Sequence, residues 1–139
     1  MAKRIQDIMT PNPVALPVTA SLIDTAMAMR DADVGAVVVL EDGRICGIVT
    51  DRDIVIRGIA GGNYPATVKL GEICSRDLTM LAPTDSVEDA VRLMREKTVR
   101  RLPVVEHGQP VGIVSLGDLA IEKDPDSALG DISAAPPNQ

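Results

Sequence analysis

The chain of 139 residues has no tryptophan and no phenylalanine, and Tyr64 is its one tyrosine. Without aromatic rings it offers no platform on which unpaired bases could stack, which disfavours single-strand nucleic-acid binding of that kind. The formal net charge of −6 also disfavours a general binder of polyanions. The core must therefore consist of aliphatic side chains and methionine.

Cysteine and histidine are equally scarce, with Cys46, Cys74 and His107 as the complete set. Two cysteines cannot form a disulfide framework, and one histidine makes no zinc site without a carboxylate cluster that the sequence does not space for it. We interpret both cysteines as small apolar residues. A single histidine leaves no Ser-His-Asp or Cys-His arrangement, and there is no P-loop or G-x-G-x-x-G motif, so the chain is not expected to be an enzyme.

Long apolar runs are also missing. No segment reaches the length of a membrane span, and residues 1–7 lack the apolar stretch of a signal peptide. Apolar residues make up 45% and charged residues 24%, as in an ordinary folded domain. We expect a cytoplasmic protein with no required cofactor, no metal and no membrane contact.

The sequence contains an internal repeat. A shift of 65 positions places residues 21–53 on residues 86–118. Gly47-Ile48-Val49 then meets Gly112-Ile113-Val114, and Asp53 meets Asp118. Between the opening segment and this block we expect the register to slip by one, so that Pro17 corresponds to Pro83.

Each copy has the same predicted order of short strand, helix, strand, strand and helix. An S-x-x-D capping signal opens an amphipathic helix at Ser21 and again at Ser86, and β-branched runs with a hairpin turn follow. We predict repeat 1 over residues 1–60, a linker over 61–69, repeat 2 over 70–123 and a weakly ordered tail over 124–139. One copy alone buries too little surface to be stable, so the two sheets should pack together with pseudo-twofold symmetry.

Both copies place a hydroxyl and a carboxylate where a strand turns into a helix, as Thr50-x-x-Asp53 and Ser115-x-x-Asp118. A reciprocal helix cap is the simplest role for such a pair. The same groups suit a ligand, because a carboxylate accepts hydrogen bonds from a ribose diol, and a hydroxyl with free helix amides suits ribose or phosphate oxygens. We favour the ligand role.

These motifs resemble the signature of cystathionine-beta-synthase (CBS) domains, together with Ile8-Met9-Thr10-x-x-Pro13 and Arg101-Leu102-Pro103-Val104-Val105. The resemblance covers residues 5–122 and implies an α+β fold of two tandem β-α-β-β-α repeats, called a Bateman module. The segment from Thr50 to Gly58 is most similar to small stand-alone bacterial members, including the hypoxic response protein type. The resemblance further implies a homodimer and an adenosine ligand.

Positive charge for a phosphate is concentrated in residues 92–101, which hold five basic residues against Glu96 alone. In the CBS-domain proteins that this sequence resembles, the basic pair before Leu-Pro-Val reaches ligand phosphates. Here that pair is Arg100 and Arg101. The first repeat has Gly35 and Ala36 at these places. A phosphate in the first repeat would then depend on Arg52 or on the arginines of the other repeat.

The adenine base of such a ligand would need an apolar pocket. We place it at the short strands expected after the opening helices, around residues 14–15 in the first repeat and residues 79–80 in the second. The candidate ligand-binding residues are thus Thr50, Asp53, Arg52, Ser115, Asp118, Arg100, Arg101, Val14, Ala15, Gly35, Ala36, Thr79 and Met80. We predict a regulatory sensor of AMP, ADP or ATP that acts on an unknown effector protein or through its own dimer. The alternatives are a constitutive dimerisation or interaction module without a small ligand, and binding of S-adenosylmethionine or nucleic acid.

Overall fold

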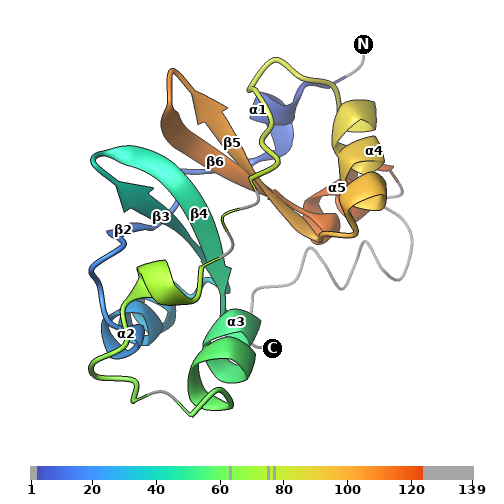
Figure 1. Ribbon diagram of the computed structural model, residues 1–139. Helices are drawn as coiled ribbons and strands as arrows, with labels where there is room; N and C mark the ends of the chain where they lie inside the picture. The colour runs from blue at the N-terminus through green and yellow to red at the C-terminus, as the bar shows by residue number, and fades with distance from the viewer. Residues whose placement is uncertain (1–2, 63, 75, 77, 124–139) are drawn as a thin grey trace. The chain divides into compact units, whose positions relative to one another are not determined.

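The computed structural model describes residues 3–62, 64–74, 76 and 78–123, and these form two compact units (Figure 1). We call Pro13–Leu78 the continuous unit, and Met1–Asn12 with Thr79–Gln139 the split unit. Each has helices and one three-stranded sheet, which confirms the mixed α+β class. The packing of the two sheets against each other stays a prediction, and the tail over 124–139 lies outside the described residues.

The sheet of the continuous unit has the order β2-β3-β4. Strand β2 (Ala15–Pro17) runs parallel to β3 (Ala36–Glu41), and β3 is antiparallel to β4 (Arg44–Thr50). Helix α2 (Leu22–Ala32) connects the two parallel strands, and the Oγ of Ser21 accepts the amide of Asp24 at 3.0 Å. The predicted S-x-x-D signal is therefore a real N-cap.

The chain beyond β4 makes one α-helical turn, α3 (Asp51–Asp53), and then widens into a π-helix, η1 (Ile54–Ile59). The second helix of the predicted repeat order falls on residues 51–60, and we expected it to be regular. The π-helix presents Gly58 to α2 so closely that an added Cβ would lie 2.5 Å from Cδ1 of Leu22. A larger residue at position 58 would force the buried side chain of Leu22 to shift, and glycine avoids this.

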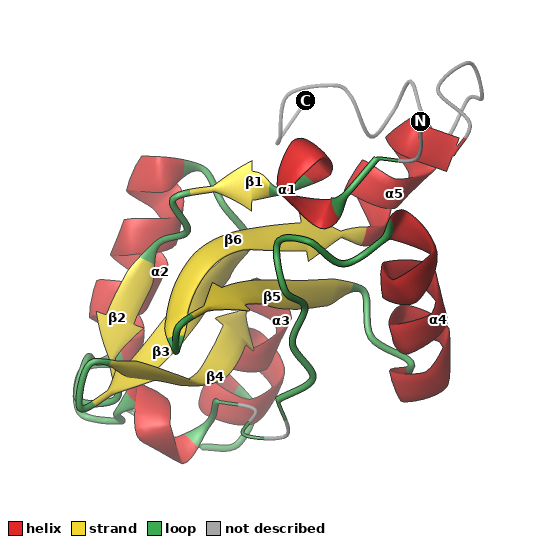
Figure 2. Cartoon of the chain, turned by 90° about the horizontal axis from the view of Figure 1, so that it is seen from above, coloured by secondary structure: helices red, strands yellow, loops and turns green. Residues whose placement is uncertain are grey.

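The sheet of the split unit has the order β1-β6-β5 and is antiparallel throughout. Figure 2 shows β1 (Thr10–Pro11), β6 (Gln109–Ser115) and β5 (Arg101–Glu106) lying side by side. The helices of this unit are α1 (Ile5–Ile8), α4 (Val87–Lys97) and α5 (Leu116–Lys123).

The duplication keeps a single offset through the short strands. Leu16 pairs with Val39 of β3. Leu81, 65 positions later, bridges to Val104 of β5, which is itself 65 positions after Val39. The slip that we expected between Pro17 and Pro83 is therefore wrong. The two prolines are similar in sequence only, because hydrogen bonding to the neighbouring strand fixes the register.

The short strand expected at residues 79–80 does not form. In the continuous unit the amide of Val38 donates to the carbonyl of Val14 at 2.8 Å. Pro103 occupies the place of Val38 in the second repeat and has no amide hydrogen to donate. The carbonyl of Thr79 therefore lacks the ladder bond that its counterpart has, and only one isolated bridge remains.

The compact units exchange the opening segments of the two repeats. Helix α1 and strand β1 open the first repeat but pack with the body of the second, and the 3-10 helix η2 (Leu70–Glu72) does the reverse. The amides of Ile5 and Leu70 donate to the carbonyls of Asp85 and Ala20, respectively, both at 2.9 Å. The boundaries of the compact units thus differ from those of the repeats.

The segment expected as a linker is packed rather than free. The carbonyl of Pro65 accepts the amide of Ile23 at 3.1 Å, and the carbonyl of Val68 accepts the amide of Leu22 at 3.2 Å. These bonds satisfy amides at the start of α2 that have no partner inside the helix. The described part of residues 61–69 is therefore an integral part of the continuous unit.

Each unit has its own aliphatic core. The buried cluster of the continuous unit consists of Leu22, Met29, Val37, Val39, Val49, Ile54, Leu70, Ile73 and Cys74. The buried cluster of the split unit consists of Ile5, Leu81, Val87, Ala90, Met94, Leu102, Val104, Val114 and Leu119. Both clusters are free of aromatic residues, as the composition requires.

Candidate functional site

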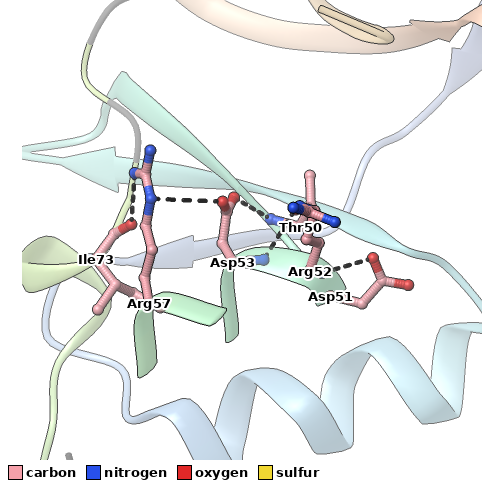
Figure 3. Close-up of polar contacts among 6 residues, drawn as sticks. All are labelled: Thr50, Asp51, Arg52, Asp53, Arg57 and Ile73. Atoms are coloured by element: carbon pink, nitrogen blue, oxygen red, sulfur yellow. Dashed lines mark hydrogen bonds and ion pairs between the residues drawn. The ribbon is translucent and has the colours of Figure 1, made fainter. Parts of the chain in front are cut away.

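The first motif lies where β4 ends and α3 begins (Figure 3). The amide of Asp53 donates to Oγ1 of Thr50 at 3.2 Å, and the amide of Thr50 donates to Oδ2 of Asp53 at 2.9 Å. This is the reciprocal cap that the spacing predicts. It fixes the hydroxyl and the carboxylate side by side at the end of the strand.

The second motif has the same geometry at the junction of β6 and α5. The amide of Asp118 donates to Oγ of Ser115 at 3.1 Å, and the amide of Ser115 donates to Oδ2 of Asp118 at 2.8 Å. The two motifs are therefore structural copies, one in each compact unit.

The caps use only part of the hydrogen-bonding capacity of these side chains. In each motif the bond to the strand amide engages Oδ2 of the aspartate, and the hydroxyl acts as an acceptor and keeps its proton. The side chain of Asp53 is 20% exposed, and Asp118 is half-buried. Neither carboxylate is sealed in the interior, so capping and ligand binding are compatible.

In the continuous unit the predicted strand residues lie directly beside the motif. Ala36 pairs with Thr50 across the sheet, and the carbonyl of Gly35 accepts the amide of Asp51 at 3.0 Å. Residues 14–15 lie one strand further, at the start of β2. All of these residues lie at one end of the same sheet.

The split unit arranges its candidates in the same way. Arg101 pairs with Ser115, and the carbonyl of Arg100 accepts the amide of Leu116 at 2.8 Å. The Arg100 residue is exposed and Arg101 is half-buried. Residues 79–80 precede the bridge to β5 and are half-buried and exposed, respectively. One arginine thus starts the strand next to the hydroxyl-carboxylate pair, and the other directly precedes it.

Arg57 was not among the residues predicted for the site. Its Nε lies 3.9 Å from Oδ1 of Asp53, and its Nη1 donates to the carbonyl of Ile73 at 3.4 Å (Figure 3). The predicted cation, Arg52, is exposed and directs its backbone amide to Oδ1 of Asp51 at 2.8 Å. The i, i+4 spacing of Asp53 and Arg57 is the signal that could have found this pair.

The two repeats carry their positive charge on different elements. The offset of 65 places Gly117 at the position of Arg52 and Glu122 at the position of Arg57. The second repeat instead has its arginines before the strand, where the first has glycine and alanine. A cation is therefore within reach of each motif, but it comes from a different segment of the chain.

Metal binding finds no support in the described residues. Over residues 3–62, 64–74, 76 and 78–123, no group of three or more His, Cys, Asp and Glu side chains is placed to hold an ion. Within the same residues, no helix is both long enough and apolar enough to cross a bilayer.

A protein with two small α+β repeats and a matching strand-to-helix junction in each belongs to the class of tandem repeat modules. The family model of the CBS domain matches residues 5–58 and again residues 70–123. The chain belongs to the CBS-domain family, which confirms the resemblance seen in the sequence.

Two curated relatives match this chain over most of their own length. The chain is 36% identical over 126 residues to the CBS domain-containing protein YhcV of Bacillus subtilis, which covers 91% of this chain and 89% of YhcV. It is 35% identical over 116 residues to hypoxic response protein 1 of Mycobacterium tuberculosis, with 83% and 81% covered. Similarity to the hypoxic response type is therefore confirmed.

Solved structures share the fold. The crystal structure of Hypoxic Response Protein I with two coordinated zinc ions has a TM-score of 0.76 at 34% identity, covering 86% of this chain and 98% of that one. The hexameric CBS-CP12 protein from bloom-forming cyanobacteria has 0.78 at 29%, covering 92% and 78%. The CBS domain pair of MJ0100, in complex with 5′-methylthioadenosine and S-adenosyl-L-methionine, has 0.82 at 19%, covering 91% and 100%, and shows likeness of fold alone.

Proposed function

We propose that this CBS pair is a regulatory module that binds an adenosine nucleotide, of the AMP, ADP or ATP kind, at its Thr/Ser-x-x-Asp junctions. Small stand-alone CBS-domain proteins of this kind are regulatory rather than enzymatic. The proposal rests on one observation above all. Each unit holds a carboxylate and a hydroxyl at the end of a strand, and the helix cap leaves part of their bonding capacity unused.

The chemistry of the junction matches a ribose. A ribose diol donates two hydrogen bonds, which a carboxylate can accept, and it can accept one from a serine or threonine hydroxyl. In the split unit the neighbouring Arg101 and Arg100 supply charge for phosphate oxygens. The ligand would thus lie along the end of the sheet, with its sugar at Asp118.

The missing ladder bond at Pro103 supplies a partner for the base. The carbonyl of Thr79 has no donor among the residues that the structure describes, whereas its counterpart Val14 accepts Val38 at 2.8 Å. An adenine amino group can donate to such a carbonyl. Thr79 flanks β5 on the side away from Ser115, so the two lie about two strand spacings, or roughly 10 Å, apart. An adenosine can span that separation.

The two sites differ in the groups that they offer to a ligand. The split unit offers the carboxylate, the hydroxyl, two arginines and an unused carbonyl in one sheet end, and we infer that it takes the charged nucleotide. The continuous unit offers Asp53 with Arg57, and the carbonyl of Val14 is already used. A less highly charged adenosine compound suits that site better.

Self-association is part of the proposal. The similar CBS-CP12 protein is hexameric, and the continuous unit exposes apolar side chains on two elements that contact each other, α2 and η1. These side chains are Ile23, Met27, Val55, Ile56 and Ile59, each more than two-fifths exposed. A second copy would cover them, and ligand binding would act on that dimer or on an effector protein in the cytoplasm.

The test compares melting temperatures with and without AMP, ATP, NAD and S-adenosylmethionine. Binding to the native state alone stabilises it by about 2.7 kcal/mol at a hundredfold excess over Kd. We expect a shift with an adenine nucleotide in the wild type, and a much smaller one in Asp118→Ala. The variant Asp53→Ala is the matched control, because it loses the same cap and carboxylate in the other unit.

Each outcome has a defined meaning. Loss of the shift in Asp53→Ala alone would reverse the ranking of the sites, and no shift with any of the four compounds would favour a constitutive interaction module. A shift with S-adenosylmethionine alone would replace the nucleotide by that cofactor. Since each capping substitution also lowers stability, every ligand-induced shift is measured against the same variant without ligand.

A further inference from the structure

The two cysteines of the chain meet in the continuous unit, although 28 positions separate Cys46 from Cys74 in the sequence. Cys46 lies on β4, and Cys74 follows η2. The two thiols lie close enough to interact, since Cys46 is among the groups that raise the pKa of Cys74. Cys74 is buried in the aliphatic cluster, and Cys46 is partly buried and packs against the same cluster. The pair is therefore a long-range contact that the fold creates.

The backbone explains why Cys46 points to this contact. Strand β4 pairs Gly47 with Val39 and Ile45 with Leu40, which leaves Cys46 as the extra residue of a β-bulge. Bulges redirect side chains, and Cys46 packs against the buried cluster to which the segment after η2 contributes Ile73 and Cys74.

The second repeat provides an internal check of the geometry. At the offset of 65, Met9 takes the place of Cys74, and Val111 takes the place of Cys46. Val111 is the bulged residue of β6, and the thioether of Met9 lies directly against Gly112 beside it. In the split unit the opening segment thus contacts the strand next to its bulge, and the equivalent places in the continuous unit hold two cysteines.

The surroundings give the two thiols different roles. Burial raises the pKa of the Cys74 thiol, and the nearby guanidinium of Arg76 partly offsets this by favouring the thiolate. Cys74 is 8% exposed, whereas Cys46 is in the half-buried class. An oxidant therefore reaches Cys46 more easily, and Cys74 is placed to react with it in a second step.

We propose that Cys46 and Cys74 are a redox pair that hydrogen peroxide converts into a reversible disulfide within one chain. The Cys46 thiolate attacks the peroxide, the O–O bond breaks, and a sulfenic acid and hydroxide form. The Cys74 sulfur then attacks the sulfenic sulfur, an S–S bond forms, and the S–O bond breaks. Two thiols and one peroxide give one disulfide and two waters, and a dithiol reductant reverses the change.

The consequence is a covalent link between the two repeats. The disulfide would join the opening segment of repeat 2 to the bulge of β4 in repeat 1, and it would close the chain from residue 46 to residue 74. Such a link restricts the unfolded chain and holds the exchanged segment in place. This inference is independent of the proposed nucleotide.

The test treats the full chain with hydrogen peroxide and follows it by intact mass and peptide mapping. Trypsin places the two cysteines in separate peptides, residues 45–52 and residues 70–76. We expect a loss of about 2 Da from the monomer and a cross-linked peptide pair that a dithiol separates. In Cys74→Ser we expect a sulfenic acid on Cys46 that dimedone labels, and Cys46→Ser should show far less label.

The wild-type map keeps the test valid even if a cysteine variant fails to fold. Chains joined to each other by disulfides on a non-reducing gel, or masses that rise by about 32 Da without the peptide pair, would overturn the proposal. Protein unfolded in urea is the control, since the contact of the thiols exists only in the fold. Equal yield of the cross-linked pair in folded and unfolded chains would also overturn it.

Discussion

The Nε of Arg57 lies 3.9 Å from Oδ1 of Asp53, the carboxylate oxygen that the helix cap leaves out. The side chains are 56% and 20% exposed, so this pair contributes at most about 1 kcal/mol to folding. A contribution so small points away from stability as its main effect. The guanidinium instead provides a cation next to the motif of the continuous unit.

The first prediction follows for Arg57→Gln. We expect stability to change by no more than about 1 kcal/mol, while AMP loses affinity for the continuous unit several-fold and adenosine does not. Calorimetry in an Asp118→Ala background isolates that site. The control is Arg30→Gln, which removes an exposed pair of similar kind at 3.0 Å from Asp31. Equal weakening of AMP and adenosine would show that Arg57 does not contact a phosphate.

The second prediction uses the difference between Val38 and Pro103. Pro103→Val supplies an amide that can donate to the carbonyl of Thr79, as Val38 donates to Val14. The sheet gains one ladder bond worth about 1 kcal/mol, and the carbonyl becomes unavailable to a base. We expect a higher denaturation midpoint together with weaker binding of AMP.

Two measurements separate this explanation from general damage. Ribose 5-phosphate has no base, so its binding should not change in Pro103→Val if only the base contact is lost. Val38→Pro in the continuous unit is the reciprocal variant and should lower stability, because it removes an existing bond. Unchanged AMP affinity in Pro103→Val would exclude the Thr79 carbonyl as a partner of the base.

The local features of the fold were predictable from the sequence. Thr50 and Asp53 stand three residues apart after a β-branched strand, and this spacing alone specifies a reciprocal cap. Ser115 and Asp118 repeat it, and the structure has both caps. Such features depend on neighbours in the chain, so a single sequence contains the information needed.

Long-range features were not predictable in this way. Either copy of the body could accept the opening segment of either repeat, because Ile5 and Leu70 are similar residues at equivalent positions. The contact of Cys46 with Cys74 depends on that exchange and on a bulge, so the cysteines were interpreted only as apolar residues. The effect of Pro103 required knowing that the amide at its position bonds to the carbonyl of the short strand, as Val38 does to Val14.

The third prediction concerns the start of α4 at low pH. Hydrogen bonds from Ser86, first from its backbone amide and then from its hydroxyl, hold the pKa of Asp89 below its usual value, and Arg92 lowers it further. Because the folded pKa is below the unfolded one, the stabilisation is present above the unfolded value and is lost as the pH falls through the folded value.

Urea unfolding across this acid range checks it. Wild type should lose stability as Asp89 becomes protonated below about pH 4, and Asp89→Asn should lack this part of the pH dependence. Asp24→Asn is the matched control, since the amide of Asp24 donates to Ser21 but, among the described residues, the amide of Ser21 makes no return bond to the Asp24 carboxylate. Identical pH profiles for wild type and Asp89→Asn would contradict the cap as the cause.

The last prediction concerns the exposed apolar side chains of α2 and η1. Ile59 is 55% exposed and Ile23 is 43% exposed, and exposed apolar side chains gathered on neighbouring elements are typical of interaction surfaces. Ile59→Lys would place a charge there, and desolvating an unpaired charge in an interface costs several kcal/mol. We expect light scattering to show a multimer for the wild type and a monomer for Ile59→Lys. Thr19→Lys adds the same charge at another exposed position and should stay a multimer. A wild type that is monomeric at all concentrations would remove the dimer from the proposal, because these side chains would then face solvent in the working protein.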